Sequence, residues 1–209
     1  MTPAGPAPGP EAGATSPALD LLCARIDALS SDTTSPVLIA LDGRSAVGKS
    51  TLARRVGART GALVVDGDDF SRGGDDADWD ARGPAEKVEL VIDWRRRRAL
   101  LIALARGATA RWQPYDWDAD DGRLGAEVVA GPAGVVLLDG AYSARPELAD
   151  LFALRVLLDL PRPTRRERLL QREGARYRAE WEARWGEAED LYFGTLMPPG
   201  SFDLVLHGS

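Results

Sequence analysis

The sequence predicts an α/β fold in which a five-stranded parallel sheet is flanked by helices. Apolar runs alternate with helical patterns over most of the 209 residues, which is typical of a parallel sheet wrapped by helices. Each run is almost continuously apolar, as strands covered on both faces require. The five candidate strands span residues 37–41, 62–65, 135–138, 154–158 and 204–206.

The folded part is expected to begin after residue 17. Residues 1–17 consist mainly of Pro, Ala and Gly without apolar periodicity, which predicts a disordered leader. Leu19, Leu22 and Ile26 then repeat at helical spacing. The hydrophobic content of 44% supplies a sizeable core, so residues 18–209 are predicted to form a single domain.

The segment after the first strand, G-R-S-A-V-G-K-S, has the phosphate-binding P-loop pattern G-x-x-x-x-G-K-S. Its glycines let the backbone curl so that N–H groups point at phosphate oxygens, Lys49 can reach the β and γ phosphates, and Ser50 can hold Mg²⁺. The loop opens a helix over 49–59, whose N-terminal end attracts anions. The alternative is an ordinary glycine-rich turn. We expect nucleotide phosphates to contact Gly43, Arg44, Ser45, Ala46, Val47, Gly48, Lys49, Ser50 and Thr51.

A long insertion between the second and third strands is predicted to hold a helix over 86–106 and an extended stretch over 109–117. Four consecutive arginines at 95–98 point in different directions around that helix, which predicts a solvated helix end. Further along, Trp181 and Trp185 stand four residues apart, a spacing that favours core packing over a cofactor site.

Acidic residues follow two strands at the positions where ligands collect in open α/β sheets. Asp68 and Asp69 come after the second strand, and a carboxylate there could take a proton from an attacking hydroxyl. Asp139 ends the third strand, where a Walker B carboxylate holds Mg²⁺ directly or through water. Solvated turn residues or helix caps are the alternative for all three.

Three arginines after the fourth strand share one helix face. Arg165, Arg168 and Arg172 fall at i, i+3 and i+7, so their guanidinium groups can bridge phosphates. Arginine is suited to stabilising charge on a transferring phosphoryl group. A surface helix rich in salt bridges to Glu167 and Glu173 is the alternative.

The composition argues against several classes of partner. A formal net charge of −6 disfavours general nucleic-acid binding, and no apolar run approaches the ~20 residues of a membrane span. The single Cys23 cannot form an internal disulfide, which is compatible with a reducing compartment. We therefore expect a cytoplasmic protein that binds neither nucleic acid nor membranes, with homo-oligomerisation left open.

The order of these features over residues 36–207 resembles the uridine kinase branch of the P-loop kinases, which includes phosphoribulokinase-like enzymes. That family carries Asp-Ser-Phe-Tyr after the second strand, then Pro-x-Tyr-Asp-Phe, Phe-Glu-Gly, and a lid that begins Thr-Arg-x-x-Arg-x-x-x-Arg-Asp. The matching segments here are D-D-F-S at 68–71, Q-P-Y-D-W at 113–117, L-D-G at 138–140 and T-R-R-E-R-L-L-Q-R-E at 164–173.

The resemblance implies a P-loop kinase fold with a substrate-side insertion and an arginine-bearing lid. It also implies an ATP- and Mg²⁺-dependent kinase whose small-molecule partner offers a hydroxyl acceptor, as in a nucleoside or nucleoside-like compound. Asp68 would be the general base, with Lys49 and Arg168 also catalytic.

The remaining site residues follow from the same resemblance. Ser50 and Asp139 would hold Mg²⁺, while Arg168 and Arg172 would contact the nucleotide. The acceptor would be bound by Asp68, Asp80, Tyr115, Trp117 and Arg165. For Tyr115 and Trp117, which could stack on a ring, half-buried packing is the alternative.

Departures from the family pattern bear on the acceptor. Uridine kinases usually have a histidine shortly after the Tyr-Asp-Phe element, whereas this chain has Asp118, Asp120 and Asp121 in that neighbourhood. A nucleoside monophosphate, a sugar or an antibiotic-like alcohol stays open as acceptor. A P-loop switch or hydrolase is an alternative of another class, although the chain contains no Asn and so lacks the Asn-Lys-x-Asp element of GTPases.

Overall fold

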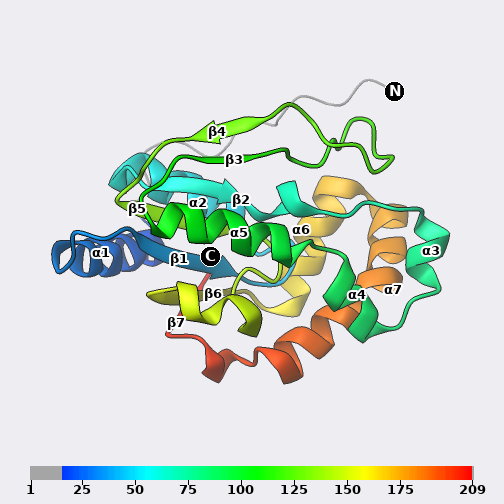
Figure 1. Cartoon of the computed structure of the whole chain (residues 1–209). Helices are drawn as coiled ribbons and strands as arrows, with labels where there is room; N and C mark the ends of the chain where they lie inside the picture. The colour runs from blue at the N-terminus through cyan, green and yellow to red at the C-terminus, as the bar shows by residue number, and fades with distance from the viewer. Residues whose placement is uncertain (1–15, 209) are drawn as a thin grey trace.

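The computed structural model describes residues 16–208, apart from the side chains of residues 173 and 175–178. Five parallel strands form the central sheet in the spatial order β2-β5-β1-β6-β7 (Figure 1). The α/β fold predicted from the apolar runs is confirmed, and each strand matches its run to within one residue at either end. These strands are β1 (Val37–Asp42), β2 (Leu63–Asp66), β5 (Val135–Asp139), β6 (Leu154–Asp159) and β7 (Leu204–His207).

Helices cover both faces of the sheet, and a second group of helices gathers beyond the carboxyl ends of the strands. In Figure 1 this second group consists of α3, α4, α6 and α7. The α-helices are α1 (Pro17–Ser31), α2 (Lys49–Thr60), α3 (Asp76–Asp80), α4 (Pro84–Leu90), α5 (Trp94–Ala105), α6 (Arg162–Glu173) and α7 (Ala175–Leu191). Short helical turns are η1 (Gly67–Phe70), η2 (Pro146–Leu151), η3 (Tyr192–Leu196) and η4 (Pro199–Ser201).

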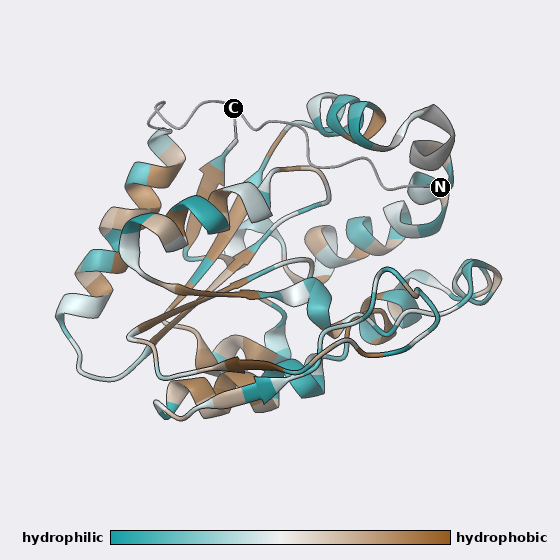
Figure 2. Cartoon of the chain, turned by 90° about the horizontal axis from the view of Figure 1, so that it is seen from above, coloured by the Kyte–Doolittle hydropathy of each residue, from teal (hydrophilic) through white to brown (hydrophobic). Residues whose placement is uncertain are grey.

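Alternate residues of each strand pack into two separate apolar layers. In β1, Ile39 and Leu41 pack with residues of α1 and α2, whereas Leu38 and Ala40 pack with α5 and the end of α7. Both sets are buried because side chains of a strand alternate between the two faces of the sheet. The apolar strands therefore run through the middle of the molecule between amphipathic helices (Figure 2).

The helix predicted over 86–106 is wrong in one respect, because the chain breaks between α4 and α5. The backbone N–H of Asp93 donates to Phe70 O at 2.8 Å, and Arg72 N–H donates to Val91 O at 3.0 Å. The Asp93 carboxylate then accepts from Arg96 N–H at 3.1 Å and caps α5. Pairing with the segment after η1 thus replaces the continuous helix.

The stretch predicted as extended over 109–117 begins with β3 (Ala110–Trp112), which pairs antiparallel with β4 (Val128–Ala130). Tyr115 and Leu124 form an isolated bridge further along the same hairpin. No helix within residues 16–208 is long and apolar enough to cross a membrane. Residues 1–15 of the predicted leader lie outside the described part of the chain, and the single-domain boundary stays a prediction.

Candidate active site

The P-loop connects β1 to α2 in a backbone conformation that its glycines permit. Gly43 has φ +151°, and a Cβ there would lie 2.3 Å from Leu158 O. Gly48 has φ +98° and stands directly before the first residue of α2. Lys49 Nζ donates to Gly43 O at 2.8 Å and to Arg44 O at 3.2 Å, so the ammonium group spans the loop. A loop, a lysine and a helix N-terminus arranged in this way can bind an anion.

Asp139 ends β5 and lies against the start of α2. Its side chain accepts a hydrogen bond from the Ser50 hydroxyl, and Oδ1 is buried without a hydrogen-bond partner in the structure. Burial raises the pKa of this carboxyl to about 6, against the opposing effect of Lys49. An orphaned carboxylate oxygen beside a hydroxyl fits Mg²⁺, which takes one or two protein oxygens and completes its shell with water and phosphate. Among the residues described, no group of three or more His, Cys, Asp or Glu side chains forms a self-sufficient cation site.

The neighbouring acids Asp68 and Asp69 lie in the η1 turn and point in different directions. Asp68 lines a cavity of about 460 Å³. Asp69 instead accepts from Trp112 Nε1 at 2.6 Å, and burial raises the pKa of its carboxyl. The turn itself is fixed by Asp66, whose carboxylate accepts from Asp68 N–H at 2.9 Å.

The position of Arg97 next to the candidate site was not anticipated from the sequence. The prediction of a solvated arginine run is wrong for this residue, because its side chain is fully buried behind the η1 turn. Its guanidinium donates to Gly67 O at 2.7 Å, to Ala141 O at 3.0 Å and to Tyr142 O at 3.3 Å. Burial lowers its pKa to about 10, still well above neutrality. This buried cation joins the turn that carries Asp68 to the loop that follows β5.

Asp42, also missed, fixes the same region from the end of β1. Its buried carboxylate accepts from the backbone N–H groups of Gly43, Tyr142 and Ala144 at 2.8, 3.1 and 2.9 Å. The Tyr192 hydroxyl donates to the same carboxylate at 2.8 Å. Burial raises the pKa of Asp42, while these hydrogen bonds oppose the rise. The first residue of the P-loop is thereby tied to the loop after β5.

Helix α6, which carries the three arginines, contacts the P-loop. Arg168 Nη1 donates to Val47 O at 3.3 Å. Arg165 Nη1 lies 3.7 Å from the carboxylate of Glu189 on α7. Arg172, in the last turn of α6, is exposed. Two of the three arginines therefore lie next to the P-loop or its contacts.

Glu189 was not anticipated from the sequence, and its position next to the P-loop is a finding of the structure. Its buried carboxylate accepts from Ser45 N–H at 2.7 Å. The carboxylate also lies 3.8 Å from Arg44 Nη1, in addition to its contact with Arg165. One P-loop amide, that of Ser45, thus already donates its hydrogen bond to a carboxylate of α7.

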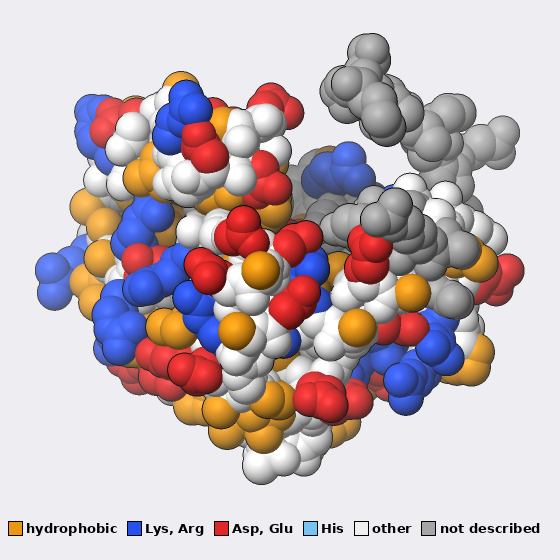
Figure 3. Space-filling view, turned by 90° about the vertical axis from the view of Figure 1, so that its right-hand side faces the viewer, with side chains coloured by type: hydrophobic (Ala, Val, Ile, Leu, Met, Phe, Trp, Pro, Cys, Tyr) orange, Lys and Arg blue, Asp and Glu red, His pale blue; other side chains and the backbone are white. Residues whose placement is uncertain are grey.

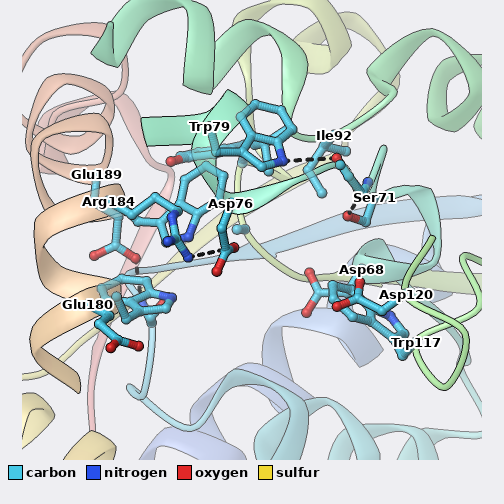
Figure 4. Close-up of a pocket in the computed structure, with 18 residues that line it drawn as sticks. Asp68, Ser71, Asp76, Trp79, Ile92, Trp117, Asp120, Glu180, Arg184 and Glu189 are labelled. Atoms are coloured by element: carbon cyan, nitrogen blue, oxygen red, sulfur yellow. Dashed lines mark hydrogen bonds and ion pairs between the residues drawn. The ribbon is translucent and has the colours of Figure 1, made fainter. Parts of the chain in front are cut away.

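The cavity extends from Ser45 and Asp68 toward aromatic side chains on α3 and α7 (Figure 4). Trp79, Trp181 and Trp185 line it, so Trp181 and Trp185, which were predicted as core packing, form part of a cavity wall instead. The rings of Trp79 and Trp185 pack against each other with centroids 5.2 Å apart. Helix α3 is placed by Gly74 and by a hydrogen bond from Trp79 Nε1 to Gly73 O at 2.9 Å.

The predicted acceptor-binding residues fall at different depths. Trp117 lines the cavity with 58% of its surface exposed. Tyr115 is buried behind it, with the two ring centroids 4.8 Å apart, and burial raises the pKa of Tyr115 to about 12. Asp80 is not among the lining residues and instead forms an ion pair with Arg184 at 2.6 Å. The side chains brought to the cavity are therefore Asp68 and Trp117, with Tyr115 and Asp80 in supporting positions.

No protein-family model matches the chain, and neither does any curated protein. Solved structures do match. A possible uridine kinase from Bacillus stearothermophilus aligns with a TM-score of 0.69 and 23% identity, over 90% of this chain and 97% of its own. A protein assigned as a fructose transport system kinase from a Silicibacter species aligns with a TM-score of 0.72 and 22% identity, over 93% of this chain and 100% of its own. A D-glycerate 3-kinase from Cryptococcus neoformans aligns with a TM-score of 0.66 and 12% identity, over 92% of this chain and 96% of its own.

These structures share an architecture with the chain at low sequence identity, and they differ in the acceptors that their names state. The likeness over nine-tenths of the chain therefore concerns the fold, and the acceptor has to be argued from the site. The five-stranded parallel sheet flanked by helices agrees with these neighbours over nine-tenths of the chain. The chain thus has the fold of the P-loop kinases of the uridine kinase and phosphoribulokinase-like type.

Proposed function

We propose that this protein is an ATP-dependent kinase that transfers the γ-phosphoryl group to a hydroxyl of a small molecule. The observation that carries the proposal is one continuous cavity whose lining includes both Ser45 of the P-loop and the carboxylate of Asp68. A phosphate donor held by the loop and an acceptor held in the cavity would meet beside a proton acceptor. Positioning of this kind supplies most of the catalysis in phosphoryl transfer.

In the proposed reaction, the P-loop amides and Lys49 hold the phosphates of ATP, and Ser50 and Asp139 hold Mg²⁺. The bound Mg²⁺ would neutralise charge on the phosphate oxygens. Asp68 takes the proton of the acceptor hydroxyl as its oxygen bonds to the γ-phosphorus, while the bond from that phosphorus to the β-phosphate oxygen breaks. The phosphorylated acceptor and ADP are the products.

The arginines of the lid are proposed to complete the donor side. Arg168 already contacts the P-loop through Val47 O, so a small side-chain movement would bring it to a bound phosphate. Arg165 would reach the transferring group when Glu189 yields its contact to the more highly charged nucleotide. Closure of this lid would also keep water, a competing acceptor, away from the γ-phosphate.

A nucleoside or nucleoside-like compound is the acceptor class that we propose first. Trp79, Trp181 and Trp185 offer ring faces and edges against which a base or sugar can pack. A nucleoside monophosphate, a sugar and an antibiotic-like alcohol remain alternatives within the kinase class. We also propose that the reaction takes place in the cytoplasm, where ATP and a reduced Cys23 are both expected.

The test is ADP formation from MgATP with and without a panel of nucleosides, sugars and other alcohols, followed by mass spectrometry of the products. A kinase gives ADP formation that rises at least about tenfold with one acceptor class, together with a product heavier by one phosphate. Hydrolysis of ATP at the same rate with and without every acceptor would instead show a P-loop hydrolase or switch. Nucleotide binding without turnover of any kind would equally contradict the proposal.

A further inference from the structure

The charge lining the cavity indicates a substrate class, on the assumption that the cavity is the acceptor site of the proposed kinase. Among the described lining residues there are five acids and a single base, Arg184. Figure 3, which faces this end of the molecule, shows acidic side chains gathered over the middle of the surface. The five acids are Asp68, Asp76, Asp120, Glu180 and Glu189.

The single base is already engaged by acids. Arg184 Nη1 lies 2.7 Å from Asp76, and its Nε lies 2.6 Å from Asp80. A second contact with Asp80, from Nη2 at 3.2 Å, makes that pair bidentate. An anionic acceptor would have to displace these carboxylates before it could use the guanidinium.

Glu189 has the same effect at the other end of the cavity. Its carboxylate lies between Arg44 and Arg165 and accepts a hydrogen bond from the Ser45 backbone N–H. The guanidinium groups of Arg44 and Arg165 therefore point toward Glu189 of α7, which lines the cavity. Arg44 also pairs with Asp190 at 2.6 Å, so both arginines of this cluster are matched by acids and offer little attraction to a phosphorylated or carboxylated acceptor.

Asp120 supplies a negative charge near the proposed base. Its backbone lies in the left-handed region, at φ +46°, and its carboxylate accepts from the Tyr115 hydroxyl at 2.6 Å. Among the described side chains, neither Asp68 nor Asp120 forms an ion pair with a basic side chain. Asp120, Asp68 and the ring of Trp117 lie together at one side of the cavity (Figure 4).

Two rings of the aromatic wall already hold cations of the chain itself. Arg82 lies over the ring of Trp79 at 4.5 Å, and Lys87 lies over the ring of Trp185 at 6.0 Å. Cations are attracted to the faces of such rings. Trp117, more than half exposed, packs its ring against that of Tyr115, whose hydroxyl donates to the Asp120 carboxylate.

We propose that the acceptor is a hydroxylated amine that carries a positive charge. Its ammonium group would lie between the Asp120 carboxylate and the Trp117 ring, and its reacting hydroxyl would face Asp68. Its ring would pack toward Trp79 and Trp181. An amino sugar or an aminoalkyl nucleoside has this chemistry, whereas a nucleoside monophosphate or a hydroxy acid does not.

The test uses acceptors that differ in charge and little else. We would compare 5-aminomethyluridine with 5-methyluridine, and glucosamine with glucose, measuring kcat/KM for phosphorylation and affinity by calorimetry with a non-hydrolysable ATP analogue. The charged member of at least one pair is expected to give kcat/KM higher by about tenfold, in line with one ion pair or cation–π contact at a partly exposed site.

A variant pair assigns that preference to the cavity. Asp120→Asn keeps the size of the side chain and tolerates the left-handed backbone, and we expect it to remove most of the tenfold preference for the amine. Asp118→Asn removes an equal charge from the same exposed loop outside the cavity lining, and we expect it to keep the preference. Equal loss in both variants would show general charge attraction rather than a site.

Failure of this inference is distinguishable from failure of the proposed function. Phosphorylation of neutral or anionic alcohols as fast as, or faster than, the matched amines overturns the inference and leaves the kinase intact. Acceptor-independent hydrolysis of ATP, with no phosphorylated product from any compound, contradicts the proposed function. In that case, amines that bind no better than their neutral partners overturn the inference too.

Discussion

Individual residues in this chain take their roles from neighbours that lie far away in the sequence. Residues 95–98 are all arginine, yet among them only Arg97 is fully buried, where it donates to three backbone carbonyls. Sequence spacing shows that consecutive helical residues point in different directions, but it does not show which direction is inward. Arg97 and Glu189 were therefore beyond prediction, whereas the P-loop residues were recognisable because their pattern is local.

Replacing Arg97 with Met should destabilise the protein by about 2–4 kcal/mol, because three buried carbonyls lose their donor. It should also lower kcat, since the guanidinium holds the turn of Asp68 against the loop after β5. Urea unfolding and steady-state kinetics measure the two effects. Arg98→Met is the matched control: Arg98 pairs with exposed Asp150, and we expect a loss below about 1 kcal/mol. Equal losses in both variants would contradict the role given to Arg97.

Asp139 makes stability depend on pH in a predictable direction. Its pKa of about 6 in the folded state exceeds the usual value of 3.8, so the folded state binds the proton more tightly than the unfolded state. Stability from this group is therefore present at low pH and is lost as the pH rises from about 4 to about 6. Asp139→Asn removes the buried charge and should stabilise the metal-free protein by about 1–3 kcal/mol at pH 7.5.

The measurement is urea unfolding in EDTA, without nucleotide, at pH 4.5 and pH 7.5. The gain from Asp139→Asn should be much smaller at pH 4.5, and the variant should bind MgATP more weakly than the parent protein does. A gain of the same size at both pH values would show that ionisation of Asp139 is not its cause.

At the scale of elements, the sequence predicts a helix or strand correctly where a single physical cause, such as burial on both faces, determines it. The parallel strands are buried on both faces and their apolar runs are continuous, so β1, β5 and β6 match their predictions closely. The helix over 86–106 failed because its interruption depends on a tertiary contact, the pairing of Ile92 with Ser71. Apolar periodicity continues through that break and contains no sign of it.

Two glycine-to-alanine substitutions are expected to change the free energy of unfolding in opposite directions. Gly43→Ala should destabilise the protein by at least about 2 kcal/mol, because φ is +151° and the new Cβ would meet Leu158 O. Gly186→Ala lies inside α7 with no heavy atom near the added Cβ, and it should stabilise by about 0.5–1 kcal/mol. Urea unfolding at one pH measures both, and a shared sign would contradict the account.

At the scale of the whole molecule, the fold separates the two halves of the proposed reaction. The P-loop and Asp139 come from the sheet and follow directly from motifs in the sequence. The acceptor wall comes from α3, α7 and the loop around Trp117, which meet only in three dimensions (Figure 1). The position of the P-loop between β1 and α2 could accordingly be predicted, and the acidic, tryptophan-lined cavity could not.

The proposed transfer depends on Asp68 rather than on its neighbour Asp69, and the two differ only in what surrounds them. The most direct test is the single-turnover rate of γ-phosphoryl transfer from ATP to the best acceptor of the panel, measured for Asp68→Asn and Asp69→Asn alongside ATP affinity. We predict that Asp68→Asn slows transfer by about 10²–10⁴-fold with little change in ATP affinity, while Asp69→Asn stays within about tenfold of the parent. Undiminished transfer in Asp68→Asn would contradict the account.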